Sequence, residues 1–266
     1  MSRLSETFSK RKALITYITA GDPNLAATEK LVYALEKAGA DIVELGIPFS
    51  DPLADGPIIQ ASHQRALKKD VSLAQVFKLV ANVRKKTTIP ICFMLSYNLV
   101  VKYGVDKFYT DCEKYGVDGV IVPDLPAEEL PPLSSRGSDF SPLSRGRKEE
   151  GVDSIFLIAP TSTDERIKLA AERSSGFIYL ISVAGITGKR QALADNLAVL
   201  VAKIKQFSKL PVAIGFGVST PAQAAQAAKV ADGVIVGSAI VDLIGKKKIQ
   251  AVPRFVASLR KAIDAL

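Results

Sequence analysis

DIVEL (41–45) is a short apolar run, and the architecture of the chain follows from how often such a run recurs. Runs rich in Val and Ile, mostly bounded by Gly, Pro or Asp, alternate with longer Ala/Lys/Leu segments of helical period. The eight runs are LITYIT (14–19), DIVEL (41–45), IPICFML (89–95), GVIV (119–122), IFLIA (155–159), FIYLIS (177–182), PVAIG (211–215) and GVIVG (233–237). Helix candidates between the runs are 24–38, 72–86, 104–116, 163–174, 192–206 and 220–229.

Near-continuous apolar strands separated by helices predict a parallel sheet that is covered on both faces. Eight such repeats in about 250 residues favour a closed (β/α)8 TIM barrel. An open, doubly wound sheet is the structural alternative. We expect one domain over residues 1–266, with a short N-terminal helix, because no segment resembles a linker between domains.

One segment, PPLSSRGSDFSPLSRGRKEE (131–150), breaks this rhythm where the helix of the fourth β/α unit is expected. It contains three prolines and two glycines, and Pro132-Leu133-Ser134 returns as Pro142-Leu143-Ser144. We interpret residues 131–148 as a short duplicated insert that is poor in core-forming residues. In the simplest interpretation this insert is a tolerated surface loop.

Composition limits the classes of protein and of chemistry. The 266 residues are 48% hydrophobic and carry a modest formal charge of +8, as in an ordinary globular protein. Two cysteines are too few for a disulfide framework or a structural four-ligand zinc site, and a single histidine excludes mechanisms that need a histidine pair. No apolar run reaches the roughly 20 residues of a membrane span, and residues 1–12 lack the apolar core of a secretory signal. We therefore expect a cytoplasmic protein whose acid and base groups are mainly carboxylates.

Polar residues gather after the second expected strand, in ELGIPFSDPLADGP (44–57). The active site of a (β/α)8 barrel lies at the carboxyl ends of the strands. Because side chains alternate along a strand, Glu44 shares one face with Ile42, whereas Val43 and Leu45 share the other. A carboxylate packed under the helices would be costly without a partner. We therefore expect Glu44 to point into the barrel.

The loop after this strand carries two further carboxylates, Asp51 and Asp55, and is stiffened by prolines at 48, 52 and 57. We expect the loop to bring both carboxylates back over the rim where Glu44 lies. Carboxylates that share an apolar site can have divergent pKa values, which would separate a proton donor from a permanent anion. In the alternative interpretation, Asp51 and Asp55 only set turns.

Glycine-rich segments follow the last two expected strands, at Gly215-Phe-Gly-Val-Ser-Thr-Pro221 and Gly237-Ser-Ala239. Glycine lets the backbone approach a ligand, and the free N–H groups of a helix start favour an anion. Phosphate-binding barrels hold phosphate in these two loops. The segments therefore predict a phosphate site, although helix capping by Ser219 or Thr220 alone would also explain part of the pattern.

The sixth expected strand and the segment after it add two further candidates. Residues 182–190 contain Gly185 and Gly188 and form a natural lid that could close over a phosphate and exclude water. An ordinary connection between a strand and a helix is the alternative. Tyr179, inside the strand, is a candidate wall of the substrate pocket, and a core aromatic is the competing interpretation.

Seven segments together resemble the tryptophan synthase alpha subunit family. They are ITAGDPN (18–24), ELGIPFSDPLADGPIIQ (44–60), GVIVPDLPAEE (119–129), IAPTSTDERI (158–167), VAGITG (183–188), GFGVSTP (215–221) and GSAIV (237–241). The resemblance covers nearly the whole chain except the insert. It implies a retro-aldol lyase that cleaves indole-3-glycerol phosphate to indole and glyceraldehyde 3-phosphate without a metal or an organic cofactor.

The resemblance also implies roles for particular residues. The family's catalytic glutamate falls on Glu44, the general acid and base, and its catalytic aspartate falls on Asp55, which stabilises the indole nitrogen. The implied substrate-binding positions are Tyr17, Thr187, Gly188, Gly217, Gly237 and Ser238. The implied partner is the tryptophan synthase beta subunit, a pyridoxal phosphate enzyme, in an alpha-beta heterotetramer.

Ser96 departs from the family pattern, and His63 has no role that the resemblance implies. Some family members carry a tyrosine that touches the catalytic aspartate after the third strand, and Ser96 stands in its place here. The single histidine, His63, lies in the helix-like stretch IIQASHQRAL (58–67), where we expect a surface or helix-packing residue.

Other functions remain open at this point. The chain could be a stand-alone indole-3-glycerol phosphate lyase, or another phosphate-binding barrel that acts on a sugar phosphate. A basic protein that binds nucleic acid, or a docking subunit that only activates a partner, is the non-enzymatic alternative. The basic clusters at 10–12, 84–86, 145–148 and 246–248 have no aromatic residues between them, so a solvated surface explains them better than nucleic acid.

Overall fold

The computed structural model describes residues 2–52, 55–129, 151–181, 190–215 and 217–266, and for 190–196 it describes the backbone only. The insert expected at 131–148 lies outside the described residues. Among the helices within the described ranges, none is long and apolar enough to cross a membrane.

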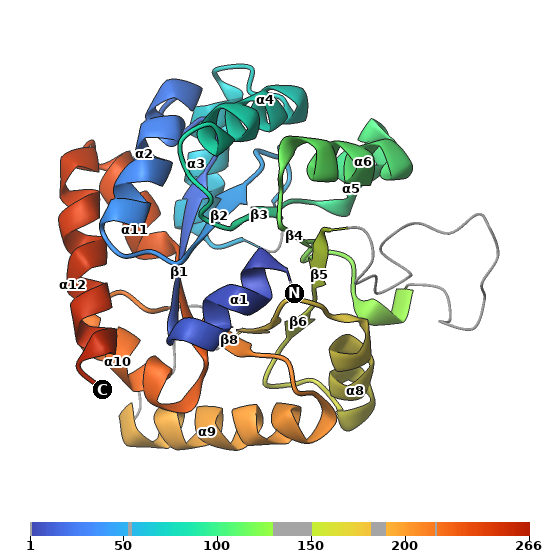
Figure 1. Cartoon of the computed structure of the whole chain (residues 1–266), viewed down its shortest axis with the longest axis vertical. Coiled ribbons are helices and arrows are strands. Elements are labelled where there is room, and N and C mark those ends of the chain that lie inside the picture. Colours follow the sequence, from blue (N-terminus) through green and yellow to red (C-terminus); the bar gives the residue numbers. More distant parts are fainter. Residues whose placement is uncertain (1, 53–54, 130–150, 182–189, 216) are drawn as a thin grey trace.

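The strands form one parallel sheet that curls into a barrel (Figure 1). The strands are β1 (Ala13–Thr19), β2 (Ile42–Gly46), β3 (Ile91–Met94), β4 (Gly119–Ile121), β5 (Asp153–Ile155), β6 (Leu157–Ile158), β7 (Ile178–Ile181), β8 (Val212–Gly215) and β9 (Gly233–Val236). Their order in the sheet is β5-β4-β3-β2-β1-β9-β8-β7-β6. Because β1 pairs with both β2 and β9, the first and last strands are neighbours. This arrangement confirms the predicted barrel, and the open-sheet alternative is wrong.

The fifth expected run forms two short strands instead of one. β5 pairs with β4, and β6 pairs with β7, with only Phe156 between them. The backbone N–H of Tyr179 donates to the carbonyl of Phe156 at 3.1 Å, which continues the contact across this interruption. The nine strands therefore correspond to eight β/α units, one of which has a broken strand.

Helices surround the barrel, except for the first one, which lies across one end (Figure 1). They are α1 (Arg3–Lys10), α2 (Leu25–Lys37), α3 (Pro57–Leu67), α4 (Leu73–Arg84), α5 (Tyr97–Tyr103), α6 (Val105–Tyr115), α8 (Asp164–Arg173), α9 (Arg190–Phe207), α10 (Pro221–Val230), α11 (Ser238–Gly245) and α12 (Val252–Asp264), with 3₁₀ turns η1 (Ala127–Glu129) and η2 (Ile249–Ala251). Each of the six expected helices begins and ends within two residues of its prediction. Side-chain caps define several starts, such as Asn24 before α2 and the Ser72–Gln75 capping box of α4.

Two apolar layers hold the fold together. The larger layer lies between the strands and the surrounding helices and includes Val43 and Leu45. The smaller layer fills the barrel and includes Ile15, Ile42 and Ile235 together with Leu4 of α1. Helix α1 therefore packs its buried leucine against the barrel interior, and Figure 1 shows it lying across one end.

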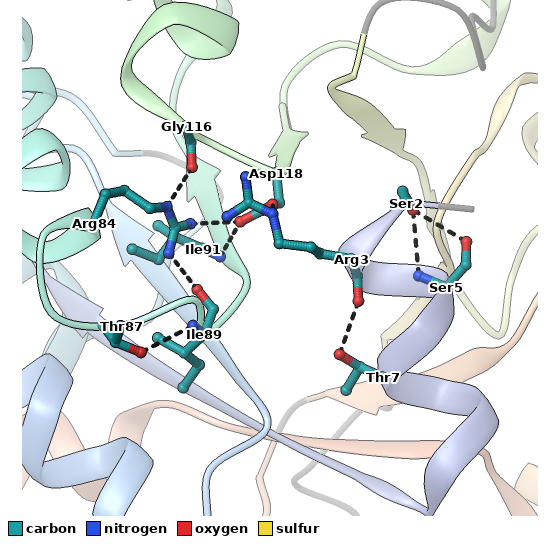
Figure 2. A network of polar contacts seen from close by, with 10 residues as sticks. All are labelled: Ser2, Arg3, Ser5, Thr7, Arg84, Thr87, Ile89, Ile91, Gly116 and Asp118. Atoms are coloured by element: carbon teal, nitrogen blue, oxygen red, sulfur yellow. Dashed lines mark hydrogen bonds and ion pairs between the residues drawn. The ribbon is translucent and has the colours of Figure 1, made fainter.

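A polar network links helices to strands at the end of the barrel where the strands begin, which we call its amino-terminal end (Figure 2). Asp118 is buried just before β4. Its carboxylate forms ion pairs with Arg3 of α1 at 2.9 Å and with Arg84 of α4 at 2.6 Å. The backbone N–H of Ile91 donates to the same carboxylate at 2.7 Å. Arg84 also donates to the carbonyls of Ile89 and Gly116. One carboxylate thus ties two helices to the starts of β3 and β4.

Candidate active site

Glu44 lies in the middle of β2, between Tyr17 on β1 and Cys92 on β3. Its neighbour two residues back, Ile42, belongs to the apolar filling of the barrel, whereas the adjacent Val43 and Leu45 pack under the helices. The side chain of Glu44 therefore lies on the interior face, as strand alternation predicts. The residue is only 1% exposed.

The carboxyl group of Glu44 has no hydrogen-bond partner among the described residues, at either oxygen. Burial raises the pKa of Glu44 to about 8, and the charge of Asp55 adds to the effect. The side chain is therefore protonated at neutral pH. A buried, protonated carboxyl without a partner is suited to donate a proton to a bound molecule.

Asp55 lies just before α3, and its side chain is 22% exposed. Burial raises the pKa of Asp55 to about 6, so this carboxylate is ionised at neutral pH. Since its charge raises the pKa of Glu44, the two groups share one region of the barrel. Their environments separate them into a proton donor and an anion.

Asp51, the third carboxylate of the motif, is exposed, and its described partner is the hydroxyl of the adjacent Ser50. Asp55 also takes part in a turn, because its N–H donates to the carbonyl of Pro52 at 3.1 Å. The structure thus brings Glu44 and Asp55 together and leaves Asp51 at the surface. For Asp51, the turn interpretation fits better than the site interpretation.

Two buried tyrosines line the same interior region. Burial raises the pKa of both Tyr17 and Tyr179 well above the ordinary value, and the charges of Asp55 and Glu44 contribute to both shifts. Each ring lies against a glycine, and a Cβ built on Gly46 would lie 1.9 Å from the hydroxyl of Tyr17. A Cβ on Gly215 would lie 2.4 Å from the hydroxyl of Tyr179. The two strand positions therefore need glycine, because a Cβ there would collide with the tyrosine side chain.

The glycine-rich segments after β8 and β9 differ in whether a side chain caps the backbone N–H groups at the start of the following helix. Thr220 caps α10 and forms a capping box with Gln223, so the helix start after β8 is satisfied by its own side chains. Gly237, before α11, makes no side-chain cap, and its neighbour Ser238 begins the helix. Gly217 has φ +76°, a conformation that favours glycine. The start of α11 is the better candidate for an anion site.

Some predicted positions cannot be placed. Thr187 and Gly188, and with them the candidate lid at 182–189, lie outside the described residues. Ser96 lies within the described residues, where its side chain bonds to Asp124 and not to Asp55. Its hydroxyl donates to Asp124 at 2.5 Å and caps α5. The described ranges contain no group of three His, Cys, Asp or Glu that could hold a metal ion.

His63 on α3 is a site residue that the sequence interpretation missed. The residue is only 5% exposed, so of the two expected positions the surface one is wrong and the helix-packing one fits. Its Nε2 lies 3.2 Å from the hydroxyl of Tyr17 and 3.7 Å from Oδ2 of Asp55. The signal was present, because the buried positions of α3 follow the spacing of a core-facing helix stripe: Ile59, Ser62, His63 and Ala66.

Comparison with known sequences agrees with this geometry. The sequence profile of the family described as "Tryptophan synthase alpha chain" matches residues 4–265. A tryptophan synthase alpha chain from Geotalea uraniireducens (strain Rf4) is 46% identical over 275 residues, covering 100% of this chain and 99% of that protein. One from Lacticaseibacillus casei is 47% identical over 268 residues, covering 100% of this chain and 97% of the relative.

Solved structures show the same fold. The crystal structure of the tryptophan synthase alpha chain from Legionella pneumophila superposes with a TM-score of 0.85 at 36% identity, covering 100% of this chain and 98% of that one. A chain of tryptophan synthase from M. tuberculosis, in its aminoacrylate-bound form, gives a TM-score of 0.84 at 34% identity, covering 99% and 100%. The chain therefore belongs to the tryptophan synthase alpha chain family, as an alpha subunit of tryptophan biosynthesis.

Proposed function

We propose that this chain is the lyase that cleaves indole-3-glycerol phosphate to indole and glyceraldehyde 3-phosphate, with Glu44 and Asp55 as its catalytic residues. Membership of the family supports a lyase, and the site supports this particular reaction. One observation carries the proposal: an unpartnered, buried Glu44 carboxyl with a pKa of about 8 lies near Asp55, whose pKa is about 6.

The reaction needs a proton at C3 of the indole ring and the loss of a proton from the adjacent side-chain hydroxyl. Protonated Glu44 donates its proton to C3, and the positive charge moves to the indole nitrogen. Ionised Asp55 accepts a hydrogen bond from that N–H and stabilises the charge. The carboxylate left on Glu44 then takes the hydroxyl proton while the bond from C3 to the side chain breaks. This step forms the aldehyde and neutral indole, and it restores protonated Glu44.

The remaining predicted residues would hold the substrate. The rings of Tyr17 and Tyr179 lie in the region of the carboxyl groups and offer apolar surface to the indole. We propose that Gly217, Gly237 and Ser238 bind the phosphate, with the start of α11 supplying N–H groups. Thr187 and Gly188 are proposed to close the phosphate end on the strength of the family resemblance alone.

The direct test is to incubate the purified chain with indole-3-glycerol phosphate and measure released indole. We expect Asp55→Asn to lower kcat by about 100-fold or more, because the positive charge on the ring loses its counter-charge. Asp51→Asn is the matched control, because it removes an exposed carboxylate from the same loop. Its turnover should stay near that of the unchanged chain. Absence of indole, or equal losses in both variants, would refute the proposal.

The family name implies a beta-subunit partner, and we propose that this partner is the pyridoxal phosphate subunit of tryptophan synthase in a cytoplasmic heterotetramer. Two large apolar side chains, Ile58 at the start of α3 and Val101 on α5, are exposed on helices that follow β2 and β3. Such side chains are suited to a protein interface. Mixing the chain with a beta subunit should produce a larger species in gel filtration and faster release of indole.

A further inference from the structure

The protonation state of His63 is determined by the groups around it. The backbone N–H of Phe49 donates to Nδ1 of His63 at 3.1 Å, so Nδ1 must carry a lone pair. A neutral imidazole with an unprotonated Nδ1 carries its proton on Nε2. Burial lowers the pKa of His63, which also favours this neutral form. His63 therefore presents an Nε2–H group toward the barrel.

His63 belongs to a hydrogen-bond network with the hydroxyl groups of Tyr17, Thr19 and Ser62, and the donors at the far end of this network can be assigned too. The hydroxyl of Ser62 donates to the carbonyl of Ile59 at 2.6 Å and so has no second proton to give. Thr19 must then donate to Ser62, at 2.5 Å, and Tyr17 must donate to Thr19, at 3.3 Å. The hydroxyl of Tyr17 is left as an acceptor.

These two results agree at the contact between His63 and Tyr17. The Nε2–H group donates to the Tyr17 hydroxyl at 3.2 Å. The hydroxyl protons of Tyr17, Thr19 and Ser62 are all donated to other acceptors, so none of them can be donated to His63. Tyr17 cannot donate to Asp55 without breaking its bond to Thr19. The same Nε2–H group lies 3.7 Å from Oδ2 of Asp55, so its single proton is donated to Tyr17 in this structure and faces Asp55 from beyond hydrogen-bond distance. A shift of about 0.7 Å would bring this contact into the ordinary range of N–H···O bonds.

We propose that His63 is a positioning residue for the indole cleavage: when substrate is bound, its neutral Nε2–H group turns from Tyr17 to the Asp55 carboxylate and holds it oriented toward the indole nitrogen. This inference rests on the proposed function, since it assigns Asp55 the task of stabilising the ring. It also gives a reason for the ordered bonds through Tyr17, Thr19 and Ser62. They leave the Tyr17 hydroxyl as an acceptor, which keeps the proton on Nε2, the ring nitrogen that lies nearer to Asp55.

Any dependence on pH must include the other groups that face this region. From β1 and its following loop these are Tyr17 and Asp22, from β2 Glu44, from β3 Cys92 and from β7 Tyr179. Burial raises the pKa values of Tyr17, Cys92 and Tyr179 well above their ordinary values, so these three groups stay neutral near pH 7. The acid limb of the activity profile then reports Asp55, and the alkaline limb reports Glu44.

Two substitutions of His63 separate its proposed role at Asp55 from its hydrogen bond to the backbone of Phe49. In His63→Asn, the side-chain oxygen can still accept the Phe49 N–H, but the amide is too short to reach Asp55. In His63→Gln, the longer amide can place an N–H near the position of Nε2. We expect His63→Asn to lower kcat about tenfold with little change in KM, because one hydrogen bond to a charged group is lost. Its acid limb should move to higher pH, because the ionised form of Asp55 has lost a donor.

His63→Gln should recover most of the turnover and return the acid limb toward its original position. The inference is overturned if His63→Asn matches or exceeds His63→Gln in kcat, or if the acid limb of His63→Asn does not move. If the unchanged chain is active, such a result refutes the role of His63 alone. If the unchanged chain releases no indole, the proposed function fails and this inference fails with it.

A second measurement needs no variant and no substrate. His63 is the single histidine of the sequence, so the imidazole nitrogen signals of the ¹⁵N-labelled chain belong to it without assignment. We expect the signals of the neutral tautomer with the proton on Nε2, and a titration midpoint below the ordinary 6.5. A proton on Nδ1, or a midpoint at or above 6.5, would overturn the inference.

Discussion

Two buried carboxylates of the barrel, Asp118 and Glu44, have opposite surroundings. At the amino-terminal end, Asp118 is met by Arg3, Arg84 and the N–H of Ile91 (Figure 2). Inside the barrel, toward the carboxyl ends of the strands, Glu44 has no described partner at either oxygen. Since an unpaired buried charge is costly, Glu44 remains protonated, whereas Asp118 is held as part of an ion network. The partners around each carboxyl group therefore distinguish Asp118, which stabilises the fold, from Glu44, which we propose as the catalytic acid.

Asp41, just before β2, repeats the pattern of Asp118 two strands away in the sheet. Its carboxylate contacts Arg11 at 2.6 Å and Arg260 at 3.0 Å, and it accepts the N–H of Leu14 at 2.7 Å. These contacts join α12 and the chain after α1 to the starts of β1 and β2. Two independent aspartates at this end are thus saturated with donors, which supports a stabilising role for the amino-terminal face.

The largest effect should come from removing the proton of Glu44. We expect Glu44→Gln to lower kcat for indole release by about 1,000-fold, because the amide cannot serve as general acid and base. Affinity for glycerol phosphate should be unchanged, since the phosphate site is formed by other segments. Turnover is measured by indole release and affinity by calorimetry. Near-normal turnover in Glu44→Gln would remove this residue from the mechanism.

The opposite outcome is expected at Asp118. Replacement by Asn removes the charge opposite Arg84, whose side chain is only 14% exposed, and should cost about 3 to 5 kcal/mol of unfolding free energy. The kcat of the folded fraction should stay within about twofold of the unchanged chain. Urea unfolding measures the first quantity and indole release the second. A large loss of kcat with unchanged stability would invert the comparison between Glu44 and Asp118.

The stability of the Glu44 site should depend on pH with a definite sign. Between the ordinary pKa of 4.5 and the folded value of about 8, Glu44 ionises in the unfolded chain but not in the folded one. Raising the pH therefore favours unfolding of the unchanged chain but not of Glu44→Gln. Relative to pH 4.5, the variant should gain about 3 kcal/mol by pH 7, with a plateau above pH 8. A difference in unfolding free energy that is independent of pH would contradict a buried protonated carboxyl.

A smaller effect distinguishes two glycines near the site. In Gly46→Ala the new Cβ meets the hydroxyl of Tyr17, so we expect a loss of about 2 kcal/mol in stability and a drop in kcat as the ring is displaced. In Gly56→Ala no atom lies within 4 Å of the new Cβ, and the change should stay within about 0.5 kcal/mol. Thermal unfolding and indole release measure both. Equal effects would mean that Tyr17 does not depend on its glycine.

The barrel and the direction of Glu44 were predictable from sequence because each follows from a local period. Alternation along 41–45 determines which side chains face the interior, and repetition of apolar runs determines the number of units. The break at Phe156 was not predictable, since IFLIA (155–159) is uniformly apolar and contains no residue that marks an interruption. That break depends on the register of β5 and β6 with different neighbours.

The candidate site was predictable in its two carboxylates and in their division into a proton donor and an anion, but not in the histidine beside them. Glu44 and Asp55 were both identified, whereas Asp51 has the same residue type and the same loop and lies at the surface. His63 was missed because a lone histidine in a helix is usually a packing residue, and its contacts to Phe49 and Tyr17 come from different strands and loops. Whether such a side chain is buried, and which groups it contacts, depends on several segments of the fold, and no local sequence pattern contains this information.

The protonation of Glu44 itself is the most direct test. The carboxyl carbon of Glu44, labelled with ¹³C and assigned by its absence in Glu44→Gln, can be titrated by NMR in the unliganded chain. A midpoint near 8 is expected from burial and from the charge of Asp55. A midpoint near the ordinary value of 4.5 would show that Glu44 is an ordinary carboxylate at neutral pH, and the proposed contrast between Glu44 and Asp118 would be wrong.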